Sequence, residues 1–314
     1  MASNQGQSRR RQSQQDLGDK TPSRKGKKPL PEPTHIGHFF VILVLKICRM
    51  ILFIDTSVKI GVYLMGVMVG SVICDLFKVP NSYFSDKRNV FNQYFVKLGW
   101  GWTIVLLGTY VALTSWVYCH GRWLAVRRHL MRLVVATIQW YVCVNVFRQI
   151  ENVVGMCTAT EHTNRDDCIA DGKGWLGFDI SGHVFLLMHN LLTISEEVKT
   201  YKDWRKLGVM LEDEDLESKR KVSAQEIAET KKLYKELTPY IKAVFVAIAF
   251  LSVIWEFMLL MSVVYRFHTL PQKVTAAFVA IMCWFVSYRL FYRSDVEWLP
   301  CPPGKTKLEY MKIE

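Results

Sequence analysis

Two histidines stand where apolar segments of the sequence begin or end. His183 follows Ser181 and Gly182 within residues 177–187, GFDISGHVFLL, and His268 closes the run VVYRFH after another apolar segment. The imidazole ring has an unperturbed pKa of about 6.5, so it can serve as a nucleophile or as a general acid near neutral pH. Two such rings on one side of a membrane would suit phosphoryl transfer, in which one attacks phosphorus and the other protonates the departing oxygen.

The residues before His183 predict a helix start that binds an anion. A helix that begins there presents unpaired N–H groups and the positive end of its dipole, and both attract a phosphate. Ser181 adds a hydroxyl group, and Gly182 lets a phosphate oxygen approach the backbone. The alternative is that Ser181 or Asp179 serves only as the N-cap of the helix.

Basic and amide side chains could supply the electrostatic part of the same site. Phosphoryl transfer concentrates negative charge on the oxygens of the transferred group, and fixed donors stabilise that charge. We expect five residues in this role: Lys87, Arg88, Asn89, Asn92 and Arg266. The alternative for Lys87 and Arg88 is contact with lipid headgroups.

The chain that must position these residues has the composition of an all-α integral membrane protein. Of its 314 residues 50% are hydrophobic and 22% are charged, with a net charge of +12, which fits neither a disordered chain nor an ordinary soluble domain. Several apolar segments approach the roughly 20 residues that a helix needs to cross hydrocarbon. They cover residues 57–77, 98–118, 130–150, 180–195, 241–264 and 273–292. We therefore expect six transmembrane helices in one domain over residues 57–292.

More polar segments surround these spans. Residues 1–35 have too few apolar side chains to bury a core, which predicts a disordered basic tail. Residues 36–56 are apolar but contain three charged residues, so we expect a helix that lies along the membrane interface. Residues 196–240 carry opposite charges three and four positions apart, which predicts a solvated helical connection. Residues 293–314 form a C-terminal tail.

The distribution of Lys and Arg predicts the orientation. With six spans, both tails and the connections 119–132 and 198–240 share one side and carry 26 of these residues, whereas the other side carries 7. The basic side of a membrane protein faces the cytosol, so both histidines are expected on the opposite side. The basic residues are not interleaved with aromatic ones, which argues against binding of nucleic acid.

The eight cysteines form no C-x-x-C pair and no cluster with histidine, so we expect neither a metal site nor a cofactor. Cys157 and Cys168 share one non-cytosolic loop, where an oxidising environment could join them in a disulfide; two free thiols are the alternative. Glu256 lies within the fifth span, where an unpaired carboxylate costs about 2.5 to 3.5 kcal/mol. Arg148, near the non-cytosolic end of the third span, is a candidate partner.

Three stretches resemble the fat storage-inducing transmembrane (FIT) family, more closely its broadly expressed second member than its muscle-type one. They are KRNVFNQYFVKLGWGWT (87–103), GFDISGHVFLL (177–187) and VVYRFHTLPQKV (263–274). The resemblance runs from about residue 58 to 292 and implies a bundle like that of the lipid phosphate phosphatases. It also implies a multi-pass protein of the endoplasmic reticulum with cytosolic termini. Its implied activity is lumenal hydrolysis of fatty acyl-CoA to acyl 4′-phosphopantetheine and adenosine 3′,5′-bisphosphate, and its implied roles are neutral-lipid binding, lipid-droplet formation and membrane homeostasis.

Carried over residue by residue, the resemblance makes His183 the general acid and His268 the nucleophile. The sequence departs from the phosphatase pattern at three positions: Ile180 replaces a proline, Ser262 an arginine, and Gln272 the aspartate that orients the nucleophile. An amide can hold a histidine tautomer, but it cannot stabilise an imidazolium as a carboxylate does.

Two hypotheses of different class follow. In the first, the protein is a lumenal acyl-CoA diphosphatase whose substrate tail lies among the spans. In the second, it is a non-catalytic membrane protein that binds neutral lipids, triacylglycerol or diacylglycerol, and partitions them into lipid droplets. A third is a transferase of the sphingolipid-synthase kind. In each case the connection 198–240 could contact cytosolic proteins.

Overall fold

The computed structural model describes residues 36–77, 80–86, 88–159, 163–213, 216, 222–265, 267–294, 296 and 299–311. The predicted tail over residues 1–35 lies outside these ranges. The chain divides into two compact units, residues 1–41 and 42–314. The second unit contains the helix bundle.

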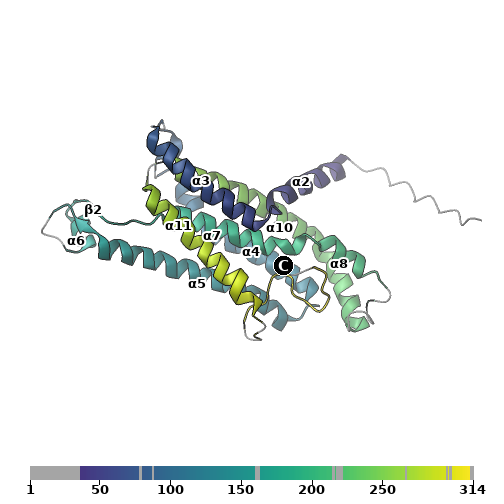
Figure 1. Cartoon of the computed structure of the whole chain (residues 1–314). Coiled ribbons are helices and arrows are strands. Elements are labelled where there is room, and N and C mark those ends of the chain that lie inside the picture. Colours follow the sequence, from purple (N-terminus) through teal and green to yellow (C-terminus); the bar gives the residue numbers. More distant parts are fainter. Residues whose placement is uncertain are drawn as a thin grey trace, which may run out of the picture. The chain divides into compact units, whose positions relative to one another are not determined.

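Long helices make up most of the second unit (Figure 1). They are α3 (Thr56–Leu76), α4 (Gly99–Tyr118), α5 (Trp123–Val154), α10 (Ala224–Val264) and α11 (Leu270–Trp284), which continues through η4 (Phe285–Leu290) and η5 (Phe291–Arg293). In the described part of the chain, five helices are long and apolar enough to cross a membrane, the last being the combined segment Leu270–Arg293. The predicted class, an all-α integral membrane protein, is confirmed.

The remaining predicted span corresponds to α7 (Gly182–Glu197), which has only 16 residues. At 1.5 Å per residue it is about 24 Å long, shorter than the roughly 30 Å hydrocarbon layer. It tolerates this length because it is surrounded by protein. It contacts α3, α4, α5, α10 and α11 (Figure 1), and all its side chains from Val184 to Glu197 are buried. Its N-terminal end carries His183.

The charged connection contains several short elements and the start of a long helix. After α7 come η3 (Val198–Tyr201) and α8 (Trp204–Met210), and two side chains of α8, Trp204 and Leu207, are buried. The second part of the connection is the first part of α10, which starts at a capping box formed by Ser223 and Glu226 and continues without interruption into the predicted span. The capping box satisfies the free N–H groups at the helix start, so helix formation begins well before the hydrocarbon.

The segment predicted along the interface forms a helix, α2 (Ile36–Leu52), which a short link separates from α3. Asp55 ends this link as the N-cap of α3, and its carboxylate accepts a hydrogen bond from the Ser57 N–H at 2.8 Å. This bond lowers the pKa of Asp55 below its usual value.

The C-terminal tail packs back onto the bundle. Arg132 of α5 forms a two-pronged ion pair with Glu197 at the end of α7, with distances of 2.7 and 2.6 Å, and also donates to the Cys301 carbonyl at 2.9 Å. Leu308 and Tyr310 are fully buried. Residues 299–311 are therefore part of the folded unit rather than a loose extension.

Glu256 of α10 has a different partner from the one that the sequence suggests. Its carboxylate accepts a 2.7 Å hydrogen bond from the Tyr63 hydroxyl of α3. Among the described residues it forms no ion pair with Arg148, so Arg148 is not its partner. A phenol satisfies an acid within the membrane without a second charge that must be desolvated.

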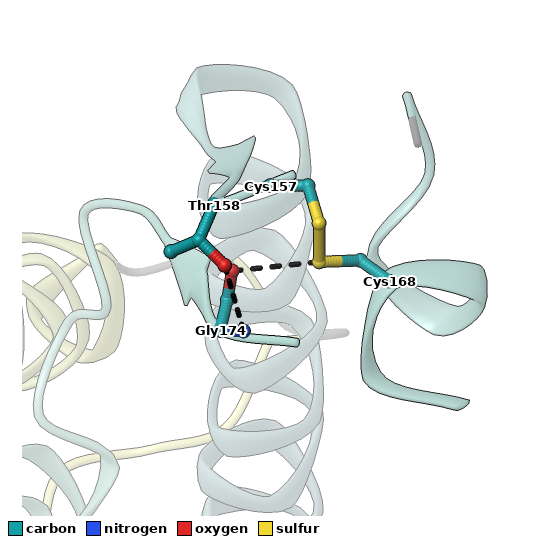
Figure 2. Close-up of a disulfide and its surroundings, with 4 residues drawn as sticks. All are labelled: Cys157, Thr158, Cys168 and Gly174. Atoms are coloured by element: carbon teal, nitrogen blue, oxygen red, sulfur yellow. Dashed lines mark hydrogen bonds between the residues drawn. A yellow bond between two sulfur atoms is a disulfide. The ribbon is translucent and has the colours of Figure 1, made fainter. Parts of the chain in front are cut away.

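A disulfide closes the loop between α5 and α7 (Figure 2). Cys157 lies in β1 (Met156–Cys157), which pairs antiparallel with β2 (Trp175–Leu176), and Cys168 lies in α6 (Arg165–Ala170). Figure 2 shows Gly174, the residue before β2, joined by dashed lines to Thr158 and to Cys168. The disulfide and the hairpin hold this loop at the end of the bundle where α7 begins.

Candidate two-histidine site

Three segments far apart in the sequence meet in a cavity of about 280 Å³ at the N-terminal end of α7. They are the connection before α4, the start of α7, and the turn between α10 and α11. The polar side chains at this cavity are Asp86, Arg88, Asn89, Asn92, Gln93, Lys97, Asp179, Ser181, His183, Ser262 and His268. The cavity therefore contains both candidate catalytic histidines.

His183 occupies the first turn of α7, where an amide fixes its ring. Its Nε2 lies 2.7 Å from Oδ1 of Asn92, which belongs to the π-helical segment η2 (Phe91–Val96). The amide oxygen only accepts hydrogen bonds, so Nε2 of His183 carries a proton in this arrangement. The hydrogen bond holds the His183 ring at the wall of the cavity.

His268 is fixed by Asp179, a residue that the sequence suggests only as a helix cap. Nδ1 of His268 lies 3.1 Å from the Asp179 carbonyl oxygen and 3.5 Å from the Asp179 carboxylate. A carbonyl only accepts, so Nδ1 is protonated and the neutral ring has its lone pair on Nε2. The carboxylate can also stabilise an imidazolium, the function that the amide of Gln272 lacks.

The side chains of Gln272 and Ser181 form hydrogen bonds with backbone N–H groups at the starts of two helices. The Gln272 side chain accepts a 2.8 Å hydrogen bond from the Thr269 N–H in a capping box at the start of α11. Ser181 is the N-cap of α7, its hydroxyl accepts from the Val184 N–H, and its own N–H donates to the Gln272 carbonyl at 3.3 Å. This last bond links the starts of α7 and α11 and thereby sets the relative position of His183 and His268.

Gly182 leaves the start of α7 open. A side-chain Cβ at this position would meet no heavy atom within 4 Å, so no neighbouring group requires a glycine. The exposed backbone at this position is accessible to a ligand, and the positive end of the α7 dipole adds to its attraction for an anion.

The connection before α4 is built to hold its polar residues in place. Asn89 is buried, donates to the Asp86 carbonyl at 2.7 Å and accepts from the Asn92 N–H at 2.7 Å. Its amide therefore shapes the turn that presents Asn92, although the sequence predicts phosphate binding. The Ser82 hydroxyl bonds to the Tyr265 hydroxyl at the end of α10, which ties the connection to the third segment of the site.

Two described cations line the cavity, Arg88 and Lys97. Arg88 is exposed, and its guanidinium forms no hydrogen bond or ion pair with any residue in the described ranges. Lys97 was not predicted from the sequence; it donates to the Gln93 side chain at 2.8 Å. The two other predicted cations, Lys87 and Arg266, lie outside the described residues.

The rest of the cavity wall is apolar. It consists of Phe84, Met258, Met261 and Phe267. The rings of Phe84 and Phe257 meet edge to face at 5.1 Å between centroids, which packs the connection before α4 against α10. A cavity lined by both polar and apolar side chains fits an amphiphilic ligand.

The fold and the cavity define a multi-pass membrane protein with a two-histidine site at one end of its helix bundle. The sequence model of the fat storage-inducing transmembrane protein family matches residues 80–155 and 149–288. The chain belongs to this family.

Several curated relatives carry the name acyl-coenzyme A diphosphatase FITM2. The Drosophila melanogaster protein is 32% identical over 92% of this chain and 70% of its own length. The Xenopus tropicalis protein is 34% identical over 73% of this chain and 80% of its own, and the Homo sapiens protein is 34% identical over 72% and 79%. No solved structure matches the chain significantly.

Proposed function

We propose that this protein is an acyl-CoA diphosphatase, a hydrolase that cleaves the phosphoric anhydride bond of fatty acyl-CoA. The observation that carries the proposal is that His183 and His268 line one cavity, each with its ring held by a hydrogen bond. The names of the curated relatives support the same activity.

His268 is the nucleophile. With its proton fixed on Nδ1 by Asp179, its Nε2 lone pair attacks one phosphorus of the diphosphate. A nitrogen–phosphorus bond forms, and the bond from that phosphorus to the bridging oxygen breaks. The ring gains positive charge in this step, and the Asp179 carboxylate stabilises it.

His183 is the general acid. In its imidazolium form it transfers the Nε2 proton to the bridging oxygen as the first phosphate product departs, which leaves the ring neutral. The neutral ring then takes a proton from the water that attacks the phosphohistidine, which releases the second product and restores both histidines. The products are acyl 4′-phosphopantetheine and adenosine 3′,5′-bisphosphate.

Arg88, Lys97 and the start of α7 stabilise the charge on the phosphate oxygens during both steps. We assign the same role to Lys87 and Arg266. The apolar wall of Phe84, Met258, Met261 and Phe267 contacts the uncharged pantetheine arm and the start of the acyl chain, because these parts of the substrate gain from burial.

We further assign the protein to the endoplasmic reticulum membrane, with cytosolic termini and a lumenal site. The excess of Lys and Arg on the side of the tails supports this orientation. In this position the enzyme supports lipid-droplet formation and membrane homeostasis, with neutral lipids as ligands and cytosolic proteins as contacts of residues 198–240.

The experiment compares hydrolysis of oleoyl-CoA by purified wild type, His183→Ala and His268→Ala. We expect His183→Ala to lower kcat by about 10²- to 10⁴-fold and His268→Ala to abolish turnover, because it removes the ring nitrogen that forms the covalent intermediate. Binding of a fluorescent diacylglycerol by the same preparations is the control for folding. Unchanged turnover in both variants would contradict the proposal and favour the non-catalytic lipid binder.

A further inference from the structure

A second cavity, of about 380 Å³, lies at the other end of α7. Its wall includes Ser195 and Glu196 from the last turn of that helix, whereas the two-histidine cavity is lined by Ser181 and His183 at the start. These ends are separated by about 20 Å along the helix axis, since each residue adds 1.5 Å. The two cavities are therefore distinct sites.

The second cavity is basic. Its basic residues are Lys199, Lys202, Lys206, Arg289 and Arg293, and its acidic residues are Asp55, Glu196 and Asp203. They come from η3, α8, the end of the last span and the link before α3, so several elements bring positive charge to one place. This convergence produces a positive potential that attracts an anion.

Two of the three carboxylates already have partners. Glu196 accepts a hydrogen bond from the Trp284 indole and forms an ion pair with Lys199, both at 3.0 Å. Asp55 caps the start of α3. These contacts satisfy Glu196 and Asp55, and they leave most of the basic side chains for a ligand.

Three of these basic side chains, Lys202, Lys206 and Arg289, have donor groups that can bind an anion in the cavity. Lys202 and Lys206 are exposed and one helical turn apart, and neither ammonium group forms a hydrogen bond or ion pair with another residue in the part of the chain that the structure describes. Arg289 lies with its guanidinium 5.2 Å from the centroid of the Trp284 ring. Stacking on an aromatic face orients the guanidinium and leaves its edge N–H groups to donate to a phosphate.

Apolar side chains beside these cations indicate that the ligand is a lipid. Ile54 lines the cavity and is 47% exposed, and Leu290 and Phe291, next to Arg289 along the chain, are 57% and 43% exposed. Leu290 and Phe291 belong to the last membrane-spanning segment. A basic pocket between helix ends with adjacent apolar surface can hold a lipid headgroup while the acyl chains stay in the hydrocarbon.

We propose that this cavity binds the phosphomonoester headgroup of an anionic phospholipid of the phosphatidate class, at the membrane face opposite the two-histidine site. The group that the cavity recognises is a phosphate with two negative charges. Inorganic phosphate carries the same group, so it is the alternative ligand that the experiment must distinguish from the lipid. Binding of this lipid does not depend on the proposed hydrolysis of acyl-CoA.

The experiment measures the thermal unfolding of the purified full-length protein in neutral detergent. Dioctanoyl phosphatidate, dioctanoyl phosphatidylcholine and inorganic phosphate are titrated separately. A ligand that binds only the folded state raises the unfolding midpoint in a saturable manner. We expect such a rise with phosphatidate, none with phosphatidylcholine, and none with phosphate over the same concentrations.

The test variant is Lys202→Gln/Lys206→Gln, and the matched control is Lys232→Gln/Lys235→Gln on α10. The control removes the same charge from exposed side chains outside the cavity. We expect the test variant to bind phosphatidate at least tenfold more weakly, and the control to bind it as the wild type does. Because Lys202 and Lys206 have no partners among the described residues, the test variant should fold normally, which its midpoint without ligand checks.

Equal weakening in both double variants would overturn the proposal, since it would reveal a diffuse charge effect. No saturable rise with phosphatidate would overturn it as well. A full rise with inorganic phosphate alone would overturn the assignment to a lipid. None of these readouts involves acyl-CoA hydrolysis, so the outcome is independent of the proposed catalytic function.

Discussion

At the scale of single residues, Asp179 performs the task that the sequence pattern assigns to position 272. Its carbonyl oxygen holds the proton on Nδ1 of His268, and its carboxylate lies 3.5 Å from the same nitrogen. Any residue at position 179 retains the carbonyl. Only an acidic residue supplies the negative charge, so the two contributions can be separated by substitution.

Asp179→Asn should lower kcat for acyl-CoA hydrolysis by about 10- to 100-fold with little change in KM. The variant keeps the tautomer but loses a charged interaction with the imidazolium, and hydrogen bonds to charged groups contribute about 1.5 to 3 kcal/mol. Steady-state kinetics of the purified protein measure the effect. Asp167→Asn, an exposed acid in the α5–α7 loop, is the control. An unchanged kcat in Asp179→Asn would show that the carboxylate does not assist His268.

The sequence allowed the two histidines to be placed at one end of the bundle, because the number of spans decides which segments share a side. It did not reveal Asp179 as the partner of His268, since 89 positions separate the two residues and the contact depends on how α7 and α11 start. Asn89 lines the same cavity, where local backbone groups bond to its amide, and its contact with the substrate stays a prediction.

At the scale of elements, helix positions followed from hydrophobicity, whereas helix lengths did not. The predicted span 98–118 corresponds to Gly99–Tyr118, but 130–150 lies within Trp123–Val154 and 241–264 within Ala224–Val264. A membrane imposes a minimum apolar length and no maximum helix length. The extensions depend on contacts outside the hydrocarbon, such as the capping box of α10 and the packing of α5 against the C-terminal segment.

The turn between α4 and α5 contains His120. The protonation state of this side chain should make the thermal stability of the protein depend on pH. Its Nδ1 lies 2.5 Å from the Thr230 hydroxyl of α10, and burial lowers the pKa of His120 below its usual value of about 6.5. The folded protein thus favours the neutral ring. As the pH falls below about 6.5, the unfolded chain takes up a proton that the folded protein resists, and this contribution to stability is lost.

His120→Asn isolates this effect, because Asn does not titrate and tolerates the positive φ of 58° at this position. We expect the wild type to unfold at a higher temperature than the variant at pH 7.5, and the difference to shrink at pH 5.5. Thermal unfolding in detergent at both values measures the difference. If the difference in unfolding temperature is the same or larger at pH 5.5 than at pH 7.5, His120 is not held neutral in the folded protein.

At the scale of the whole molecule, α7 connects two cavities and fixes the C-terminal segment. His183 stands at one end of the helix and Glu197 at the other. Glu197 accepts hydrogen bonds from Arg132 of α5 and from the Tyr288 hydroxyl at 2.8 Å, and Arg132 also holds the Cys301 carbonyl. Both charged side chains are fully buried. One ion pair thus joins three parts of the chain that the sequence gives no reason to associate.

Arg132→Met should therefore destabilise the protein by about 3 to 5 kcal/mol, because it leaves the Glu197 carboxylate buried without its counter-charge. Removing both charges in Arg132→Met/Glu197→Leu should recover part of this loss, since no unpaired ion then remains in the interior. Arg127→Met, at an exposed position of the same helix, is the control and should unfold as the wild type does. Equilibrium unfolding in detergent compares the four proteins. If the double variant is less stable than Arg132→Met, the hydrogen bond that the Tyr288 hydroxyl donates to Glu197 stabilises the fold more than the unpaired charge weakens it.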